Sequence, residues 1–441
     1  MISLPSSSSK RYLSGMDWLI QSLDSAARAG TGIGNVSQIV LELQGEFPYQ
    51  VFLDHMREFV ALHPFLTGFT SRDWNLAPYW KIPASAGLRF VPVQKIVLND
   101  EENEEEINER LTESVNRCFD HKRHHLSFSV LSGSNRAFLV MQFDHCLLDA
   151  RGAEAFLGQI HAFICGKIKE PYRLSPAPAY LDHWAEKFES GRQVSRMFVA
   201  LGEKEPPSSI PLPYEKKDRA SAFVFRSYSA DRGEEILQDA YKRAGYLMIS
   251  PYLLAHSARA AHLLFSKYGY SRDHYIIPVN VDMRLKEDID EKLFFNHLSF
   301  TYYKYMAEEC ESIDSLCSML TRQLYEQVKK QVSYHLVQAS IPLRIAPKRL
   351  LARLIRIPFK GTMGSFSFSY LGHNGYSEDN FMGLKIRNIL HMPRVPHSPG
   401  MGIFVTRFQG QFNIVISYMR GSFLRQDVEE MLDEMEKSLP G

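Results

Sequence analysis

A proline-rich stretch between Pro171 and Pro213 interrupts a chain that otherwise shows clear helix and strand periodicity. On both sides of it, apolar residues recur at the spacing of helices and, elsewhere, at the spacing of strands. This arrangement favours two layered domains, each mixing helices and strands. We therefore predict an α/β or α+β fold with a first domain over residues 1–189, a linker over 190–217 and a second domain over 218–441.

Charge and cysteine content exclude several classes of protein. The 51 basic and 50 acidic side chains leave a net charge of +1, which lacks the basic excess needed to bind nucleic acid. Five scattered cysteines, with no C-x-x-C pair, favour a reducing compartment. The polar, serine-rich start does not resemble a secretory signal, and no apolar run has membrane-spanning length. We expect a cytoplasmic protein.

Periodicity predicts the main elements of both halves. In the first half we expect helices at 13–23, 49–62, 100–118 and 153–164, a strand at 36–44, and a hairpin of strands at 125–131 and 136–143. In the second half we expect helices at 232–245, 251–268 and 425–439, and strands at 222–227, 275–281, 366–371, 402–408 and 412–418. The halves show no short-period repeat.

The residues with the clearest chemical potential lie between the second hairpin strand and the helix that follows it. His145 and Asp149 stand four apart in FDHCLLDARG, and Gly152 after them favours a loop. A neutral imidazole is a suitable general base for a hydroxyl or amine at physiological pH. The neighbouring carboxylate would hold the local geometry rather than accept the proton.

Other readings of nearby residues are weaker. Cys146 follows His145 directly, so the two side chains point to opposite sides in extended chain, and we expect a small core residue. The cluster His121, His124 and His125 has a lysine and an arginine between its members, which favours a solvated loop over zinc. A metal-dependent hydrolase using His145 and Asp149 lacks a convincing third ligand, and we predict no metal site.

The chain resembles the superfamily of thioester-dependent acyltransferases, which includes chloramphenicol acetyltransferase, wax ester synthases, alcohol acetyltransferases and the condensation domains of nonribosomal peptide synthetases. The resemblance covers nearly the whole chain. It is carried, in order, by LSGMDWL at 13–19, LELQGEFPYQVFLDHMREFVALHPFLTG at 41–68, FDHCLLDARGAEAF at 143–156, YLMISPYLLAHSARAAH at 246–262, IIPVNVDMR at 276–284 and SFSYLG at 367–372. The central block is similar to the family motif H-H-x-x-x-D-G.

Two positions depart from that motif. Asp144 stands where many members have the first histidine, and Ala150 stands where they have the glycine after the aspartate. A methyl group at the second position restricts backbone geometry that a glycine allows. These departures leave a second hypothesis open, a non-catalytic binding or scaffold protein with a degenerate site.

The resemblance implies a fold and a site. The fold is a two-layer sandwich of two chloramphenicol acetyltransferase-like subdomains that form a V with a central tunnel. His145 would be the base and Asp149 would point away from the tunnel onto Arg284, whose alternative is a surface charge. Gly152 would support the same loop. Asn280, Ser369 or Tyr370 would donate to the oxyanion or contact substrate, and the sequence does not choose among them.

The resemblance also implies the reaction. An acyl group would pass from a thioester, acyl-CoA or acyl-phosphopantetheine, to an alcohol or amine acceptor of small-molecule or lipid type. Since a thiol of pKa about 8.5 leaves readily, no covalent acyl-enzyme is required. No permanently bound cofactor is expected.

A basic amphipathic helix is predicted over residues 347–360. It sets apolar residues against Lys348, Arg349, Arg353 and Arg356 on a nearly neutral protein. Such a helix suits an acidic acyl carrier protein, the phosphates of coenzyme A, or an anionic membrane surface. The alternative is a partly buried helix with a basic outer face.

Overall fold

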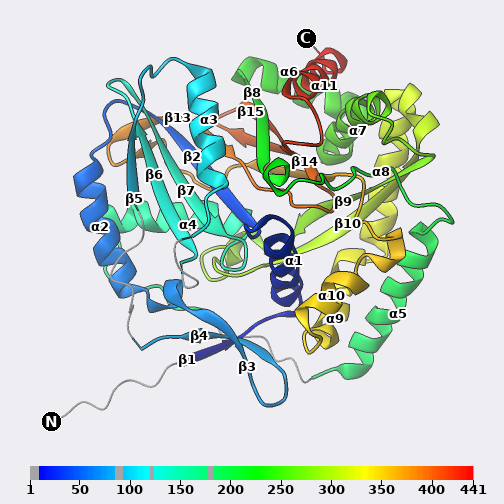
Figure 1. Ribbon diagram of the computed structural model, residues 1–441, viewed down its shortest axis with the longest axis horizontal. Coiled ribbons are helices and arrows are strands. Elements are labelled where there is room, and N and C mark those ends of the chain that lie inside the picture. The colour runs from blue at the N-terminus through cyan, green and yellow to red at the C-terminus, as the bar shows by residue number, and fades with distance from the viewer. Residues whose placement is uncertain (1–8, 85–92, 120–123, 176–181, 441) are drawn as a thin grey trace.

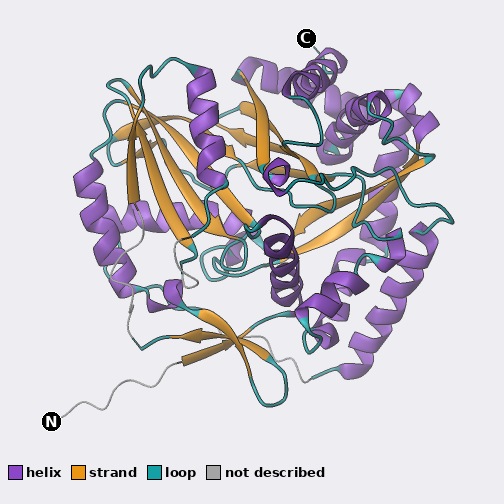
Figure 2. Cartoon of the chain, in the orientation of Figure 1, coloured by secondary structure: helices purple, strands orange, loops and turns teal. Residues whose placement is uncertain are grey.

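The computed structural model describes residues 9–84, 93–119, 124–175 and 182–440 (Figures 1 and 2). Two six-stranded sheets, each packed against helices, make up most of the protein, and a small three-stranded sheet lies beside them. The mixed fold predicted from periodicity is confirmed. Within the described residues, no helix has both the length and the apolar character needed to cross a membrane.

The first sheet has the strand order β12-β13-β2-β7-β6-β5. Its strands are β2 (Val36–Gln44), β5 (Val93–Val97), β6 (Leu126–Ser132), β7 (Arg136–Asp144), β12 (Asn380–Phe381) and β13 (Leu384–His391). The predicted hairpin is confirmed, because β6 and β7 pair antiparallel in the register Ser129↔Val140. Alternate residues of these strands face two different cores. One core contains α2 (Tyr49–Leu62) and α4 (Ala150–Ile164), and the other contains α3 (Glu104–Val115).

The second sheet has the strand order β10-β9-β11-β14-β15-β8. Its strands are β8 (Ser221–Tyr228), β9 (His274–Asp282), β10 (Leu298–Met306), β11 (Ser367–His373), β14 (Met401–Phe408) and β15 (Gln411–Met419). The helices α6 (Ala230–Arg243), α7 (Ile249–Lys267), α8 (Ile313–Lys329) and α11 (Arg425–Ser438) supply apolar residues to its main core. Every strand predicted for this half belongs to this sheet.

Four further helices lie in the centre and lower right of the view in Figure 1. They are α1 (Gly15–Thr31), α5 (Trp184–Leu201), α9 (Val332–Leu343) and α10 (Lys348–Leu354). The small sheet contains β1 (Ser9–Tyr12), β3 (Phe69–Arg72) and β4 (Pro78–Ile82). Short 3₁₀ turns occur at η1 (Pro64–Thr67), η2 (Lys216–Arg219), η3 (Lys286–Asp288), η4 (Ala307–Glu311) and η5 (Ile357–Phe359). Helix α1 is longer than predicted. Its capping box of Ser14 and Asp17 fixes the start, and Gly32 ends it with a φ of 84°.

A shared core joins the two halves. Phe138 and Val140 of β7 pack in one apolar cluster with Phe223 of β8 and Val415 of β15. Beside it, the Asn388 side chain of β13 donates to Asn413 Oδ1 of β15 at 3.0 Å. A buried amide pair of this kind adds specificity to an otherwise apolar interface.

Two sequence expectations differ from these elements. The predicted linker over 190–217 begins inside α5, an 18-residue helix that packs on α9, so it is not a simple connection. Strands β12 and β13, which fall in the predicted second domain, pair into the first sheet through β13 and β2. Long-range strand pairing of this kind leaves no mark in local periodicity. The division at 189 and 218 stays a prediction.

The basic amphipathic helix predicted over 347–360 was wrong in its extent. Helix α10 ends at Leu354, and a short 3₁₀ turn, η5, follows it. Pro358 disfavours helical geometry at the preceding residue, which opposes a continuous helix through this position. The break changes which basic side chains reach solvent, as described below.

Candidate active site

His145 lies in a tight turn between β7 and α4, directly after the C-terminal end of β7, a central strand of the first sheet. Its backbone N–H donates to Asn35 O at 3.0 Å, and its backbone carbonyl accepts from Asn296 Nδ2 at 2.9 Å. A short parallel bridge between Leu148 and Phe295 fixes the same turn. The loop therefore has hydrogen-bond partners from both halves of the chain.

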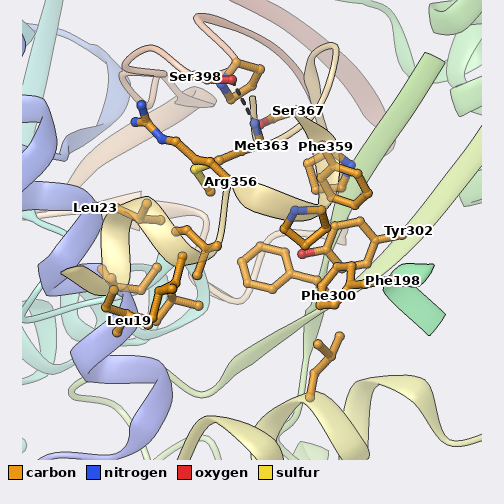
Figure 3. Close-up of a pocket in the computed structure, with 18 of the residues that line it drawn as sticks. Leu19, Leu23, Phe198, Phe300, Tyr302, Arg356, Phe359, Met363, Ser367 and Ser398 are labelled. Atoms are coloured by element: carbon orange, nitrogen blue, oxygen red, sulfur yellow. Dashed lines mark hydrogen bonds between the residues drawn. The ribbon is translucent and has the colours of Figure 1, made fainter. Parts of the chain in front are cut away.

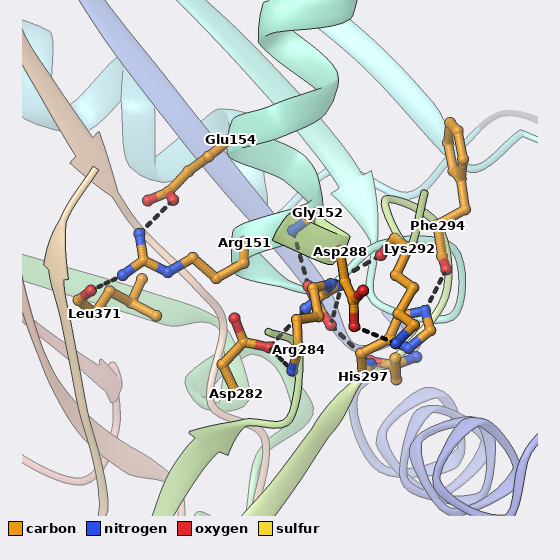
Figure 4. Close-up of polar contacts among 12 residues, drawn as sticks. Arg151, Gly152, Glu154, Asp282, Arg284, Asp288, Lys292, Phe294, His297 and Leu371 are labelled. Carbon is orange, nitrogen blue, oxygen red and sulfur yellow. Dashed lines mark hydrogen bonds and ion pairs between the residues drawn. The ribbon is translucent and has the colours of Figure 1, made fainter. Parts of the chain in front are cut away.

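Asp149 ends this turn and caps α4. Its Oδ1 accepts from Gly152 N at 2.9 Å, and its Oδ2 accepts from His297 N at 2.9 Å. Both oxygens also accept from Arg284 Nη2 at 2.8 Å, so the predicted contact with Arg284 is present. The side chains of Asp149 and Arg284 are 5% and 1% exposed, which makes this a buried ion pair rather than a surface one. Figure 4 shows Arg284 between Asp282 and His297.

The electrostatic consequence is a firmly ionised carboxylate. Burial alone would raise the pKa of Asp149, but the Arg284 guanidinium and the two backbone N–H groups lower it below its usual value. Arg284 is held in turn by Asp282, at 2.9 Å, and by the carbonyl of Lys292, at 2.8 Å from Nε. Asp149 thus acts on His145 by fixing the turn, and its hydrogen bonds are directed away from the imidazole.

Gly152 has a steric reason to be glycine. A Cβ built on it would lie 2.1 Å from the backbone oxygen of Leu293, a contact that a side chain cannot make without moving the backbone. The residue therefore lets the first turn of α4 approach the 293–297 segment. The close approach of Gly152 to Leu293 gives a physical basis for the predicted role of this glycine in supporting the turn. That role remains a prediction.

Asp144, the departure from the family motif, is part of a buried charge network. Its Oδ1 accepts from Cys146 N at 2.8 Å, and its Oδ2 lies 3.1 Å from His125 Nδ1 and 3.4 Å from Arg28 Nη2. Burial would raise the pKa of Asp144, but the hydrogen bond and charge of His125, with help from Arg28, hold it at about 2. The aspartate therefore anchors the front of the turn, as Asp149 anchors its end.

The second departure, Ala150, causes no backbone conflict. It is the first residue of α4, and it is absent from the described residues that have a positive φ. A methyl group is tolerated in this conformation.

The imidazole of His145 is neutral in these surroundings. Burial lowers its pKa, and the carboxylates of Asp149 and Asp144 oppose that effect only in part. The side chain of Asn296 also raises the pKa of the ring to a small extent. A neutral ring at physiological pH has one nitrogen free to accept a proton.

His145 lines a cavity of about 850 Å³. Its walls come from α1, α5, α9, α10, β9, β10 and the 393–399 segment, so both halves contribute. Most of the lining is apolar, and Figure 3 shows Leu19 and Leu23 on one side with Phe198, Phe300 and Tyr302 on the other. A large, mainly apolar cavity with a few polar groups is the usual form of a small-molecule site.

The predicted oxyanion contacts are only partly supported by position. Asn280, on β9, lines the cavity with His145. Ser369 is 4% exposed and Tyr370 packs against the second core, and neither belongs to the lining. Ser367, earlier on the same strand, is the serine that reaches the cavity. The register of β11 shifts between Tyr370 and Gly372, an irregularity that sequence did not reveal.

The basic residues of the predicted helix divide into two groups. Arg349 and Arg353 are exposed, as a docking surface requires. Lys348 lies over the Trp18 ring at 4.9 Å, and burial lowers its pKa. Arg356 lines the cavity. The expectation of four basic residues on one surface is therefore wrong for Lys348 and Arg356.

The remaining candidate groups do not form a second centre. Cys146 is buried, and burial raises its thiol pKa far above the ordinary value, so it is a poor nucleophile. Asp24, Asp144 and Cys146 bring ligand atoms within 4.8 Å of one another, but Arg28 already pairs with both carboxylates. His121 of the histidine cluster lies outside the described residues.

Asn296 and Arg356 are the side chains of this region that the sequence reasoning did not assign to the site. Asn296 is 5% exposed, and its backbone N–H also donates to Asp17 Oδ1 at 2.8 Å. Its only local signal is a polar residue directly after the apolar run LFF. For Arg356, the signal was the helix-breaking Pro358 two residues later.

The solved structures with a similar fold include an acetyltransferase and a condensation domain. TRI3 trichothecene 15-O-acetyltransferase from Fusarium sporotrichioides has 14% identity and a TM-score of 0.68, with 97% of this chain and 94% of that chain covered. The first condensation domain of the calcium-dependent antibiotic synthetase, in complex with a substrate analogue, has 15% identity and a TM-score of 0.68, with 97% and 96% covered. Polyketide synthase associated protein 5 from Mycobacterium tuberculosis has 14% identity and a TM-score of 0.61, with 97% and 96% covered.

Sequence comparison adds nothing to this likeness, since no family model and no curated protein matches the chain. At 14–15% identity, the structural likeness is evidence of the fold. Over nearly its whole length, the chain has the two-subdomain α/β fold shared by these acetyltransferase and condensation domains.

Proposed function

We propose that the protein is an acyltransferase that moves an acyl group from a coenzyme A or carrier-protein thioester to an alcohol or amine, with His145 as general base. One observation carries the proposal: a neutral histidine lines a large cavity, in a turn fixed at both ends by buried carboxylates. The names of the structural neighbours, an acetyltransferase and a condensation domain, support the same class of reaction.

In the proposed reaction the acceptor hydroxyl or amine attacks the thioester carbonyl while His145 takes its proton. The new carbon–oxygen or carbon–nitrogen bond forms, the carbon–sulfur bond breaks, and the thiolate leaves with the electron pair of that bond. The protonated imidazole then returns a proton to the thiolate, so no acyl-enzyme is needed. Acyl-CoA or acyl-phosphopantetheine acts as co-substrate, and no resident cofactor takes part.

Neighbouring residues would assist this step without reacting. Asn296 Nδ2 donates to the backbone carbonyl of His145 at 2.9 Å and so helps to hold the turn that carries the ring. Asn280, the member of the predicted trio that lines the cavity, is our candidate donor to the oxyanion. Asp149 and Arg284 are positioning residues, because their contacts hold the turn and do not reach the cavity.

The second candidate is a non-catalytic binding protein. Asp144 and Ala150 favour it, because both differ from the motif of the catalytic members. The cavity would serve either function, so activity has to decide between them.

The test is turnover of a panel of acyl thioesters with alcohol and amine acceptors, with products identified by mass spectrometry. Thiol-specific dyes are unsuitable alone, because Cys118 and Cys165 are exposed and would react. Loss of a general base predicts a fall of about 10²- to 10⁴-fold in kcat for His145→Ala. His55→Ala, on α2 outside this cavity, is the matched control and should retain activity.

Three outcomes are informative. Acyl transfer that is lost in His145→Ala with an unchanged unfolding midpoint supports the proposal. A fully active His145→Ala protein rules out the base. Binding without turnover of any thioester and acceptor pair favours the non-catalytic candidate.

A further inference from the structure

Arg356 is a cation that lines the cavity and has no anionic partner among the described residues. Its Nε is buried and has no hydrogen-bond partner among the described residues, and its Nη2 donates to His397 O at a long 3.4 Å. Figure 3 shows the Arg356 side chain between Met363 and Leu23, among the residues that line the cavity. A half-buried guanidinium with five donors and one long contact is unsatisfied.

In the part of the chain that the structure describes, no carboxylate pairs with this charge. Burial is the sole cause that lowers the pKa of Arg356, and none of the ion pairs found among the described residues includes it. Glu203 is the carboxylate that lines the cavity, and it pairs with Lys304. Arg394, also in the lining, differs because it donates to Gly34 O at 3.0 Å and Ser221 Oγ at 3.2 Å.

A buried, unpaired charge is costly, and an anionic ligand removes that cost. The surroundings of Arg356 suit a carboxylate better than a phosphate. A planar guanidinium matches one carboxylate through two parallel hydrogen bonds. A phosphate would need further donors. The nearby Met363 N–H is already used by Ser398 Oγ, at 3.0 Å, and Lys360, which also lines the cavity, is exposed to solvent.

The rest of the cavity favours an apolar body on the same ligand. Phe198 stacks edge-on against Tyr302 and Phe359, with ring centroids 5.3 and 5.6 Å apart. The opposite wall is formed by aliphatic side chains of α1 and α10, namely Leu19, Ile20, Leu23, Leu351 and Leu354. Binding a hydrocarbon chain or ring system against these walls is favourable, because it removes apolar surface from water.

We propose that the cavity binds an apolar carboxylic acid, with its carboxylate on Arg356 and its hydrocarbon body along the aromatic and aliphatic walls. This inference rests on the proposed function only in treating that acid as the acceptor, which would then carry its reacting hydroxyl or amine elsewhere on the apolar body. Binding itself does not depend on His145, so the two proposals can fail separately.

The experiment compares decanoate, decanol and decyl phosphate by isothermal titration calorimetry with the full chain. Charge-assisted hydrogen bonds predict that decanoate binds on the order of 10- to 100-fold more tightly than decanol. Arg356→Met should remove this preference and leave the affinity for decanol unchanged. His145→Ala should keep the preference, and Arg353→Met, an exposed arginine three residues earlier, should keep it as well.

Arg356→Lys is a second variant, which keeps the inference testable if Arg356→Met does not fold. It keeps the charge without the planar pair of donors, so we expect an intermediate preference. Equal affinity of the wild-type protein for acid and alcohol would overturn the inference, and so would a preference that survives Arg356→Met. Tighter binding of decyl phosphate than of decanoate would overturn the assignment of a carboxylate.

Discussion

Replacing Arg284 with methionine tests whether the Asp149 pair holds the catalytic turn. The substitution keeps an extended side chain but removes the guanidinium, and it leaves Asp149 buried with only two backbone donors, from Gly152 and His297. Breaking a buried ion pair by removing one partner costs about 3–5 kcal/mol of unfolding free energy. Because two hydrogen bonds to Asp149 remain, we expect a loss of unfolding free energy near the lower end of this range, about 3 kcal/mol.

The effect should depend on pH in a defined direction. In the wild-type protein the pKa of Asp149 is lowered, so its stabilising contribution is present above the unfolded-state pKa and is lost as the pH falls through the folded value. Without Arg284, burial is opposed less, and the folded pKa rises. The destabilisation by Arg284→Met should therefore be largest at neutral pH and smaller at about pH 4, close to the pKa of aspartate in an unfolded chain.

The assay is urea unfolding followed by far-ultraviolet circular dichroism, at neutral pH and at about pH 4. Arg110→Met is the control, because Arg110 and its partner Glu113 are 38% and 52% exposed, and an exposed helical pair contributes about 0.3–0.5 kcal/mol. The double variant with Asp149→Asn should recover part of the loss, since the unpaired charge is gone. A loss in Arg284→Met no larger than in Arg110→Met would refute the structural role of the buried pair.

Two further predictions concern the same turn. Gly152→Ala should destabilise the protein by about 1–3 kcal/mol, because the added Cβ would clash with Leu293 O. Gly158→Ala, on the same helix, adds a Cβ that contacts nothing and should stabilise the protein by up to about 1 kcal/mol. The urea unfolding midpoints of both variants test these two expectations. If Gly152→Ala proves neutral, the close approach is not rigid. For activity, the lowered pKa of His145 predicts that the acidic limb of kcat/KM against pH falls below the ordinary histidine value of about 6.5; a limb above that value would contradict the burial of the ring.

Local pattern predicted the elements that build the site, and the resemblance predicted its central contacts. The β6–β7 hairpin and helix α4 follow from periodicity, because their apolar faces repeat along a short stretch of chain. The pair of Asp149 and Arg284, 135 residues apart, followed from the family motif alone. Periodicity carries no information on which distant side chains meet.

The errors have physical causes of the same kind. Ser369 and Tyr370 were chosen by motif position, but Ser367, two residues before Ser369 on the regularly paired part of β11, lines the cavity instead. Arg356 was placed on a surface helix because its basic neighbours share helical spacing, yet the chain breaks before Pro358 and turns that side chain inward. In both cases the cavity wall is assembled from segments far apart in the sequence, and local spacing does not show which side chain reaches it.

The turn around His145 depends on contacts with both halves of the chain. Asp144 at its start is held by His125 and Arg28 of the first half, whereas Asp149 at its end is held by Arg284 of the second. Asn296, also from the second half, binds the carbonyl of His145 between them. Any movement that separates the halves must therefore break buried charge-assisted bonds at the histidine itself. The replacement of a histidine by Asp144 fits this arrangement, because a carboxylate can accept from Cys146 N, His125 and Arg28 together, which an imidazole cannot do.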